Sequence, residues 1–506
     1  MTGLQQVQQA TTIARSRPRE QLMLLILVPF VGFLSLANLA TYPTISGWDE
    51  GTYLQFGSNL ARYGEYGTCN GDTFERLIPA GGTGPTLIVP VALALQLSSH
   101  SLVAARLVVV IYFLIAVVGV YVLMRQIGGW PAAGVGVLLF IVAGDSTYDM
   151  LWASRQVLAE APAFAFLMFG LWTWIKSWHG NRTWLIASGI LIALAVITKN
   201  QLLWVIGPGF ALTIIIDRLY FHQLNWAHSL VPLGGAILGY GVWYVVALWI
   251  VGPTAQTSYL EALSALAAAT YLHGNVGRWF YNLKEFFEHP QSWVAMVAIV
   301  YGLYRGRERS AASLARVALP IFASVGVAGF ILQAIAFPRY ELLPLAFALL
   351  SCALLIDDLA GWAARRWRSN VPWRVIVIAL LTAALAGPRI VQNVQRILTT
   401  NDTSAEQFAI QLDNTVPPDA EVLNWEWEIE FYSRSKFVHP PFRLFPALLD
   451  ALDQRYDPIL DQPCIPSGTK YLVVGPFGHP VFDSTLEQRR HRLLVNEGPY
   501  YLYQFY

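Results

Sequence analysis

Residues 101–124 read SLVAARLVVVIYFLIAVVGVYVLM, and this stretch decides the kind of fold that the chain can adopt. About 20 consecutive apolar residues are enough for an α-helix to cross the hydrocarbon core of a bilayer. Similar apolar runs recur along the chain at 22–41, 85–98, 131–148, 157–175, 184–198, 201–216, 229–251, 291–304, 317–337, 340–356 and 375–392. Because helices satisfy their own backbone hydrogen bonds in lipid, the pattern predicts a polytopic α-helical membrane protein.

The composition of the whole chain agrees with this prediction. Of its 506 residues, 55% are hydrophobic and only 13% are charged, whereas soluble proteins have about 25% charged residues. Residues 401–506 carry 15 acidic and 8 basic side chains, and the first 400 residues carry 17 and 25. A basic, apolar body followed by an acidic, water-soluble tail excludes a nucleic-acid-binding protein and a fully embedded transporter.

The N-terminus has the features of a membrane anchor. Arg15, Arg17 and Arg19 precede the first apolar run, and no small-residue cleavage site follows that run within reach. The run is therefore interpreted as a retained signal anchor, with residues 1–20 in the cytoplasm.

Positively charged residues gather in cytoplasmic loops, so the basic loops indicate the orientation of the spans. These loops contain Arg125, Lys176, Arg182, Arg218, Arg305, Arg307, Arg309, Arg316, Arg365, Arg366, Arg368 and Arg374. They fall on one side only if the 85–98 run is re-entrant or interfacial, which leaves about eleven spans in a membrane domain of residues 21–392. The loops 42–100 and 252–290 and the tail, residues 393–506, are then external.

The tail is expected to be a small α/β domain. Runs of strand-forming residues bounded by Pro, Gly and Asp lie at 422–423, 471–474 and 500–506, and helical patterns lie at 403–413 and 484–492. The motif NWEWE at 424–428 combines aromatic and acidic side chains. It suits either a sugar or peptide site or a surface that docks onto the membrane domain.

The segment GWDEGTY at 47–53 carries the most informative polar residues. Two adjacent carboxylates at a membrane surface, Asp49 and Glu50, are costly unless they bind a cation, pair with a base or transfer protons. The simpler alternative is that one of them caps the helix expected over 50–62. That helix is amphipathic, and Leu54 and Phe56 are expected to face lipid.

These features resemble the membrane glycosyltransferases of the GT-C fold, in particular the protein O-mannosyltransferase and lipid A aminoarabinose transferase group. In that group an Asp-Glu element follows the first span and precedes a tyrosine, as Asp49, Glu50 and Tyr53 do here. Similar stretches are SRQVLAE at 154–160, ITK at 197–199 and PRYELLP at 338–344. The resemblance implies transfer of a hexose or pentose, with inversion, from a polyprenyl phosphate-linked donor to a hydroxyl of a protein, lipid or glycan on the external face.

The resemblance also implies roles for individual residues. Asp49 would deprotonate the acceptor hydroxyl, and Glu50 would orient Asp49 or bind a divalent metal ion. The aminoarabinose transferases commonly have a Lys-Pro-Pro element before the re-entrant segment, where this chain has GTGPT at 82–86. The cation that binds the donor phosphate would therefore come from elsewhere.

Three external bases near span ends, Arg155, Lys199 and Arg339, are the candidates for that phosphate site. The alternative for each is a side chain that snorkels to the interface. Glu160 lies just inside a span and needs a partner, which Arg155 is close enough in sequence to supply. Tyr53, Glu160 and Tyr340 are expected to support the site.

His273 in the second external loop is a candidate metal ligand beside Asp49 and Glu50, and a solvated surface histidine is the alternative. The three cysteines have no metal-ligand spacing. Cys69 and Cys464 are both expected on the external side, where a disulfide between them could form.

Two other functional classes fit the same residues. A transporter or flippase of lipid-linked sugars would use the charged residues as a substrate pathway, but the sequence has no pseudo-symmetric halves and transport needs no tail domain. A non-catalytic accessory subunit would keep the fold without the activity, and the presence of both Asp49 and Glu50 argues against it.

Overall fold

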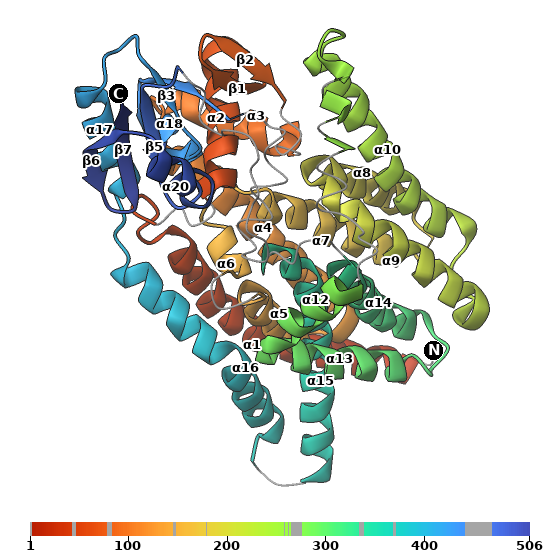
Figure 1. Cartoon of the computed structure of the whole chain (residues 1–506). Helices are drawn as coiled ribbons and strands as arrows, with labels where there is room; N and C mark the ends of the chain where they lie inside the picture. Colours follow the sequence, from red (N-terminus) through yellow and green to blue (C-terminus); the bar gives the residue numbers. More distant parts are fainter. Residues whose placement is uncertain are drawn as a thin grey trace.

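The structure is a computed structural model of the whole chain. It describes residues 3–42, 47–77, 83–144, 148–178, 180–257, 259–261, 263–264, 276–332, 338–367, 371–440 and 468–506. Figure 1 shows a large helical body with a small mixed domain at one end, next to the helix α2 and the hairpin β1–β2.

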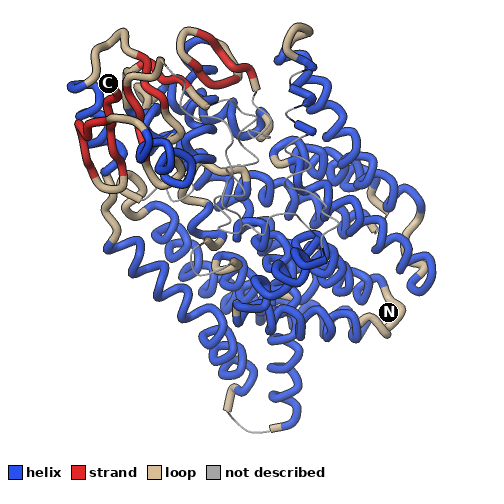
Figure 2. The backbone as a smooth tube through the Cα atoms, viewed as in Figure 1, coloured by secondary structure: helices blue, strands red, loops and turns tan. Residues whose placement is uncertain are grey.

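Each apolar run found in the sequence contains a helix within the described residues (Figure 2). The corresponding helices are α1 (Gly3–Leu36), α3 (Pro85–Leu97), α4 (Leu102–Gly128), α5 (Trp130–Ile141), α7 (Glu160–Ser177), α8 (Arg182–Thr198), α9 (Leu203–Ile216), α10 (Trp226–Val251), α13 (Pro290–Arg305), α14 (Ala311–Leu332), α15 (Leu342–Arg366) and α16 (Trp373–Thr399). The other elements of this part of the chain are α2 (Gly47–Tyr63), β1 (Gly67–Asn70), β2 (Thr73–Arg76), α6 (Met150–Ala153), η2 (Asn200–Leu202), η3 (Asp217–Phe221), α12 (Val276–Glu288) and η4 (Pro338–Glu341).

The helical body has the properties of a multi-pass membrane protein. Among the described residues, seven helices are long and apolar enough to cross a bilayer. Large apolar side chains are exposed along α10, including Ile237, Val245 and Trp249, which is the expected arrangement for a helix that faces lipid. The 13 residues of α3 give a helix of roughly 20 Å, which is shorter than the hydrocarbon core. The count of eleven spans stays a prediction.

The tail forms the expected small α/β domain. Its sheet has the order β4-β3-β5-β7-β6, and the strands are β3 (Glu421–Leu423), β4 (Lys436–Val438), β5 (Tyr471–Val474), β6 (His491–Glu497) and β7 (Tyr500–Phe505). Strand β3 runs parallel to β4 and β5, and β7 runs antiparallel to β5 and β6. The helices of this domain are α17 (Ser404–Thr415), α18 (Trp427–Tyr432) and α20 (His479–Gln488). The helix predicted at 484–492 is wrong in its last residues, because His491 and Arg492 pair with β7.

The tail docks onto the membrane body through α18, which contains part of the NWEWE motif. This helix packs against α2, and a Cβ at Gly51 would overlap the backbone of Trp427 and Glu428. The rings of His100 and Phe431 stack with their centroids 4.6 Å apart. The motif therefore serves as a docking surface, which is one of its two interpretations from sequence.

The same contact corrects the expectation for the lipid-facing side of α2. Leu54 and Phe56 are buried inside the protein rather than exposed to lipid. Helix α2 packs between α18 of the tail and α3, so both of its faces are covered. Its amphipathic pattern indicated a buried face but could not show that the tail domain, rather than the bilayer, covers it.

Three buried glutamates lie in α18 or at its N-terminal cap. Glu426 accepts hydrogen bonds from the backbone N–H groups of Gly475 at 2.8 Å and Gly478 at 2.7 Å, just before α20. Glu428 accepts one from the Tyr500 hydroxyl at 2.9 Å, and Glu430 accepts one from Asn424 Nδ2 at 2.9 Å. Burial and the neighbouring carboxylates raise the pKa of both Glu426 and Glu428.

The close approach at Gly51 yields a prediction about the tail. Gly51→Ala should push α18 away from α2 and lower the stability of the docked tail by about 1–3 kcal/mol, because a methyl group there overlaps backbone atoms. Thermal unfolding and limited proteolysis of the tail measure the effect. The control is Gly234→Ala, where a Cβ meets nothing within 4 Å. Equal behaviour of both variants would contradict the docking contact.

Candidate functional site

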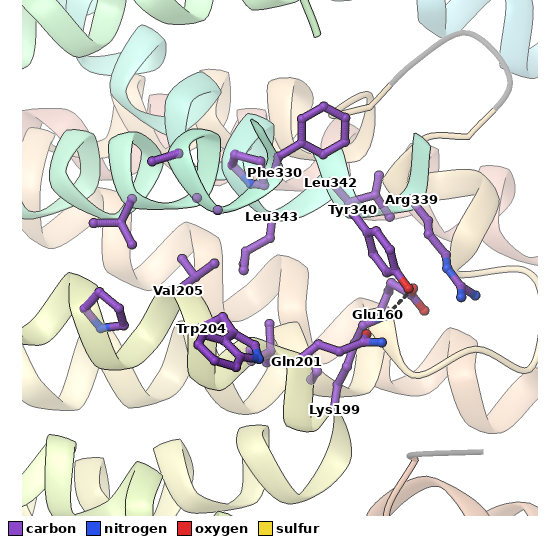
Figure 3. Close-up of a pocket in the computed structure, with 18 of the residues that line it drawn as sticks. Glu160, Lys199, Gln201, Trp204, Val205, Phe330, Arg339, Tyr340, Leu342 and Leu343 are labelled. Carbon is purple, nitrogen blue, oxygen red and sulfur yellow. Dashed lines mark hydrogen bonds and ion pairs between the residues drawn. The ribbon is translucent and has the colours of Figure 1, made fainter. Parts of the chain in front are cut away.

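A cavity of about 400 Å³ opens between α7, α9, α14 and α15. Most of its wall is apolar and includes Trp204, Val205 and Leu343. Its polar side chains, among them Lys199 and Arg339, come together at one end, as Figure 3 shows. A cavity with an apolar wall and charged side chains at its mouth suits a ligand that has a long hydrocarbon chain and an anionic head.

Lys199 is held at the mouth by the backbone around it. It follows the last residue of α8 in an extended conformation and forms a β-bridge with Thr83. The backbone N–H of Gly84 donates to the Thr198 carbonyl at 3.3 Å, and a Cβ at Gly84 would overlap the carbonyl oxygen of Ile197. Thus Thr83 and Gly84 of the GTGPT segment support Lys199 by close backbone packing.

Glu160 is the ion-pair partner of Lys199. Its Oε1 lies 2.5 Å from Lys199 Nζ, and both side chains are largely buried. Glu160 begins α7 and Lys199 follows the end of α8, so these two packed helices bring the charges together at one end. The predicted pairing of Glu160 with Arg155 is wrong. Although the two residues are close in sequence, Glu160 pairs with Lys199, and Arg155 contacts the end of α1 instead.

Asp49 and Arg339 form a second ion pair at the same mouth. Asp49 lies in the first turn of α2, where the helix dipole stabilises a negative charge, and its side chain is 9% exposed. Arg339 and Tyr340 belong to η4 and line the cavity (Figure 3). Tyr53, one turn after Asp49, is buried in α2. The structure thus brings Asp49, Glu160, Lys199, Arg339 and Tyr340 to one place.

Glu50 points away from this mouth into the protein. Its two carboxylate oxygens accept hydrogen bonds from Arg106 Nε and Nη2, each at 2.8 Å, and both side chains are fully buried. Glu50 also accepts from the backbone N–H of Val157 at 3.0 Å. Arg106 Nη1 donates to the carbonyls of Leu39 and Tyr42. The pair therefore connects α2 and α4 to the segment between α1 and α2, through Leu39 and Tyr42, and to Val157 just before α7.

Sequence reasoning missed Arg106, although a signal for it was present. It is a charged residue near the start of an otherwise apolar run, and a charge in such a place needs a partner. In the structure, the carboxylate that pairs with Arg106 is that of Glu50. The pairing could not be assigned from sequence because 56 positions separate the two residues.

Arg155 lies outside the cavity lining. Its guanidinium donates to the carbonyls of Leu34 and Ala37 at the end of α1 and lies 4.3 Å from the centroid of the Tyr42 ring. These contacts hold the end of the first span. The structure therefore does not bring Arg155 together with Lys199 and Arg339.

The described residues contain no cluster of three or more His, Cys, Asp or Glu side chains that could hold a metal ion. Within this part of the chain the oxygens of Glu50 are occupied by Arg106, and Asp49 pairs with Arg339. The predicted third ligand, His273, lies outside the described residues, as does Cys464. The metal stays a prediction.

The buried Glu50–Arg106 pair yields a stability prediction. Arg106→Leu should lower the free energy of unfolding by about 3–5 kcal/mol, because it leaves Glu50 buried without a counter-charge. The exposed Arg76–Glu65 pair provides a control, and Arg76→Gln should cost at most about 1 kcal/mol. Thermal unfolding in detergent micelles compares the two, and similar melting temperatures would show that the buried pair is dispensable.

Comparisons with known proteins agree with this architecture. A profile of the family described as dolichyl-phosphate-mannose-protein mannosyltransferase matches residues 85–239. A search of curated protein sequences finds no match.

Solved structures are similar over nearly the whole chain. ArnT from Cupriavidus metallidurans bound to undecaprenyl phosphate superposes with a TM-score of 0.62 at 14% identity, over 95% of this chain and 97% of that one. The archaeal oligosaccharyltransferase AglB from Archaeoglobus fulgidus, in complex with an inhibitory peptide and a dolichol-phosphate, gives 0.58 at 13% identity, over 96% and 74%. A complex of the Archaeoglobus fulgidus oligosaccharyltransferase with Zn and sulfate gives 0.54 at 14%, over 90% and 68%. The chain has the GT-C fold, as the resemblance in its sequence implied.

Proposed function

We propose that this chain is a glycosyltransferase that moves a sugar from a polyprenyl phosphate-linked donor to a hydroxyl acceptor on the external face of the membrane. The observation that supports this most directly is the cavity with an apolar wall and the paired charges Lys199–Glu160 and Arg339–Asp49 at its mouth. Two of the similar structures contain a polyprenyl phosphate or a dolichol phosphate.

The donor phosphate is assigned to Lys199 and Arg339. Both side chains line the polar end of the cavity, whereas the rest of the wall can contact a prenyl chain. A phosphate that enters the mouth competes with the carboxylates already paired there, because cations bind phosphate through strong charge-assisted hydrogen bonds. Binding of the donor would thus loosen Asp49 from Arg339.

The released Asp49 can then act as the general base. It takes the proton from the acceptor hydroxyl as that oxygen bonds to the anomeric carbon of the sugar, and the bond from this carbon to the phosphate oxygen breaks. The electron pair stays on the lipid phosphate, where Lys199 and Arg339 stabilise the additional charge. In this scheme Glu50 positions Asp49 through its buried contact with Arg106.

A prediction for donor binding follows. Lys199→Gln or Arg339→Gln should weaken binding of undecaprenyl phosphate roughly ten- to hundredfold, since each removes a charge-assisted contact worth about 1.5–3 kcal/mol. Equilibrium binding to the purified chain measures the affinity. Folded Arg155→Gln should keep the wild-type affinity, because Arg155 does not line the cavity. Unchanged affinity in both mouth variants would eliminate the phosphate site.

The base assignment is tested by Asp49→Asn. This variant keeps the side-chain size but cannot take a proton, so transfer should fall about a hundred- to ten-thousandfold. Binding of undecaprenyl phosphate should be retained or become tighter, since Arg339 loses a competing carboxylate. Mass analysis of envelope glycans compares a deletion strain complemented with wild type or with Asp49→Asn. Equal glycans in the two strains would favour a transporter or an accessory subunit.

The proposed orientation has its own test. In a cysteine-free background, Asp419→Cys in the tail should react with a membrane-impermeant thiol reagent on intact cells, because this exposed position is assigned to the external side. Glu308→Cys, between α13 and α14, should react only after the membrane is opened. The reverse pattern would invert the topology.

A further inference from the structure

A second cavity, of about 520 Å³, lies at the opposite end of α15 from the candidate site. It is lined by residues from the last turns of α13 and α15 and the start of α16; the ends of α15 and α16 form the lower end of the molecule in Figure 1. The 25 residues of α15 span roughly 37 Å, which exceeds the thickness of the hydrocarbon core. The two cavities therefore lie near opposite membrane interfaces.

The carboxylates of this cavity are already neutralised. Asp358 accepts a hydrogen bond from the Tyr301 hydroxyl at 3.1 Å and forms an ion pair with Arg316 at 3.0 Å. Arg305 Nε lies 3.5 Å from the same carboxylate. Asp357 pairs with Arg374 Nη2 at 2.8 Å. These acids hold the cavity together and offer little to a cationic ligand.

The basic side chains outnumber the acids. Three arginines and two carboxylates line the cavity, so its lining carries a net positive charge; the arginines are Arg305, which also lies 3.9 Å from Glu308 outside the lining, Arg365 and Arg374. Arg365 is exposed at its edge, and no carboxylate among the described residues lies within ion-pair distance of it. A guanidinium placed in this way can bind two oxygens of a phosphate.

Tryptophans place the cavity at the level of the lipid headgroups. Trp362 lines it and is exposed, and the rings of Trp362, Trp367 and Trp373 form a continuous series with centroid separations of 5.9 and 5.0 Å. Tryptophans concentrate at membrane interfaces, where one part of the ring contacts lipid and another contacts water. Leu359, also exposed and in the lining, offers an apolar side to an acyl chain.

We infer that this cavity binds the phosphate of an anionic phospholipid from the leaflet opposite the candidate active site. Basic pockets between membrane helices are suited to such headgroups because lipid phosphate and surface potential act together. The bound lipid would join α13, α15 and α16 at one interface, while the start of α15 adjoins η4 and Arg339 at the other. The inference does not depend on the proposed transferase activity.

Native mass spectrometry of the purified full-length chain tests this site. Phosphatidylglycerol and phosphatidylcholine with identical acyl chains are titrated, and the fraction of protein carrying each lipid is measured. Wild type should prefer phosphatidylglycerol. Arg365→Gln should weaken phosphatidylglycerol binding about fivefold, as expected for the loss of one basic contact near the membrane surface. The matched control is Arg366→Gln, an exposed neighbour that does not line the cavity.

A second variant keeps the charges. Gly361→Leu places a side chain beside Arg365 and narrows the cavity, so it should also weaken phosphatidylglycerol binding. Equal binding of the two lipids to wild type would overturn the inference, and so would equal loss in Arg365→Gln and Arg366→Gln. If inorganic phosphate raises the melting temperature as much as phosphatidylglycerol does, the site takes a soluble anion and the lipid assignment is wrong.

Discussion

A charge removed from water must be paired within the protein, and this requirement determines how the candidate site is assembled. Three acids near the mouth of the cavity each have a basic partner from a distant part of the chain. These pairs are Asp49 with Arg339, Glu50 with Arg106, and Glu160 with Lys199. Together they connect α2, α4, α7, the end of α8 and η4, so the site is a meeting point of segments that the chain itself places far apart.

The three pairs differ in burial, and this difference separates their roles. The Glu50–Arg106 pair is inaccessible to solvent and makes further hydrogen bonds to backbone groups. The other two pairs border the cavity, where an anion can reach their basic members. The buried Glu50–Arg106 pair therefore fixes the positions of the helices. The other two pairs provide the positive charges, on Lys199 and Arg339, that a phosphate can bind. This division explains how two adjacent carboxylates, Asp49 and Glu50, can serve different purposes.

The tail domain is part of the same assembly. Its helix α18 packs against α2 at Gly51, two positions after Asp49, and its strand β4 receives a backbone hydrogen bond from Gly71 in the hairpin β1–β2. Glu426 and Glu428 are buried close to this contact, and their hydrogen-bond partners Gly475, Gly478 and Tyr500 belong to the tail domain itself. The catalytic helix proposed here is thus held between the membrane body and the tail.

The sequence by itself determined the class of the protein and most of its elements. Long apolar runs predict membrane helices, since the backbone must be satisfied within each segment, and each predicted run contains a helix within the described residues. Short-range motifs also identified Asp49 and Glu160 as acids that need a partner, and Lys199 and Arg339 as candidate phosphate ligands. Only the tertiary structure decided which partners they have: Lys199 rather than Arg155 pairs with Glu160, and Arg106 pairs with Glu50. It also decided that Leu54 and Phe56 contact protein instead of lipid. The physical reason is that helix formation depends on local sequence, whereas ion pairs and buried faces depend on which helix ends meet in space.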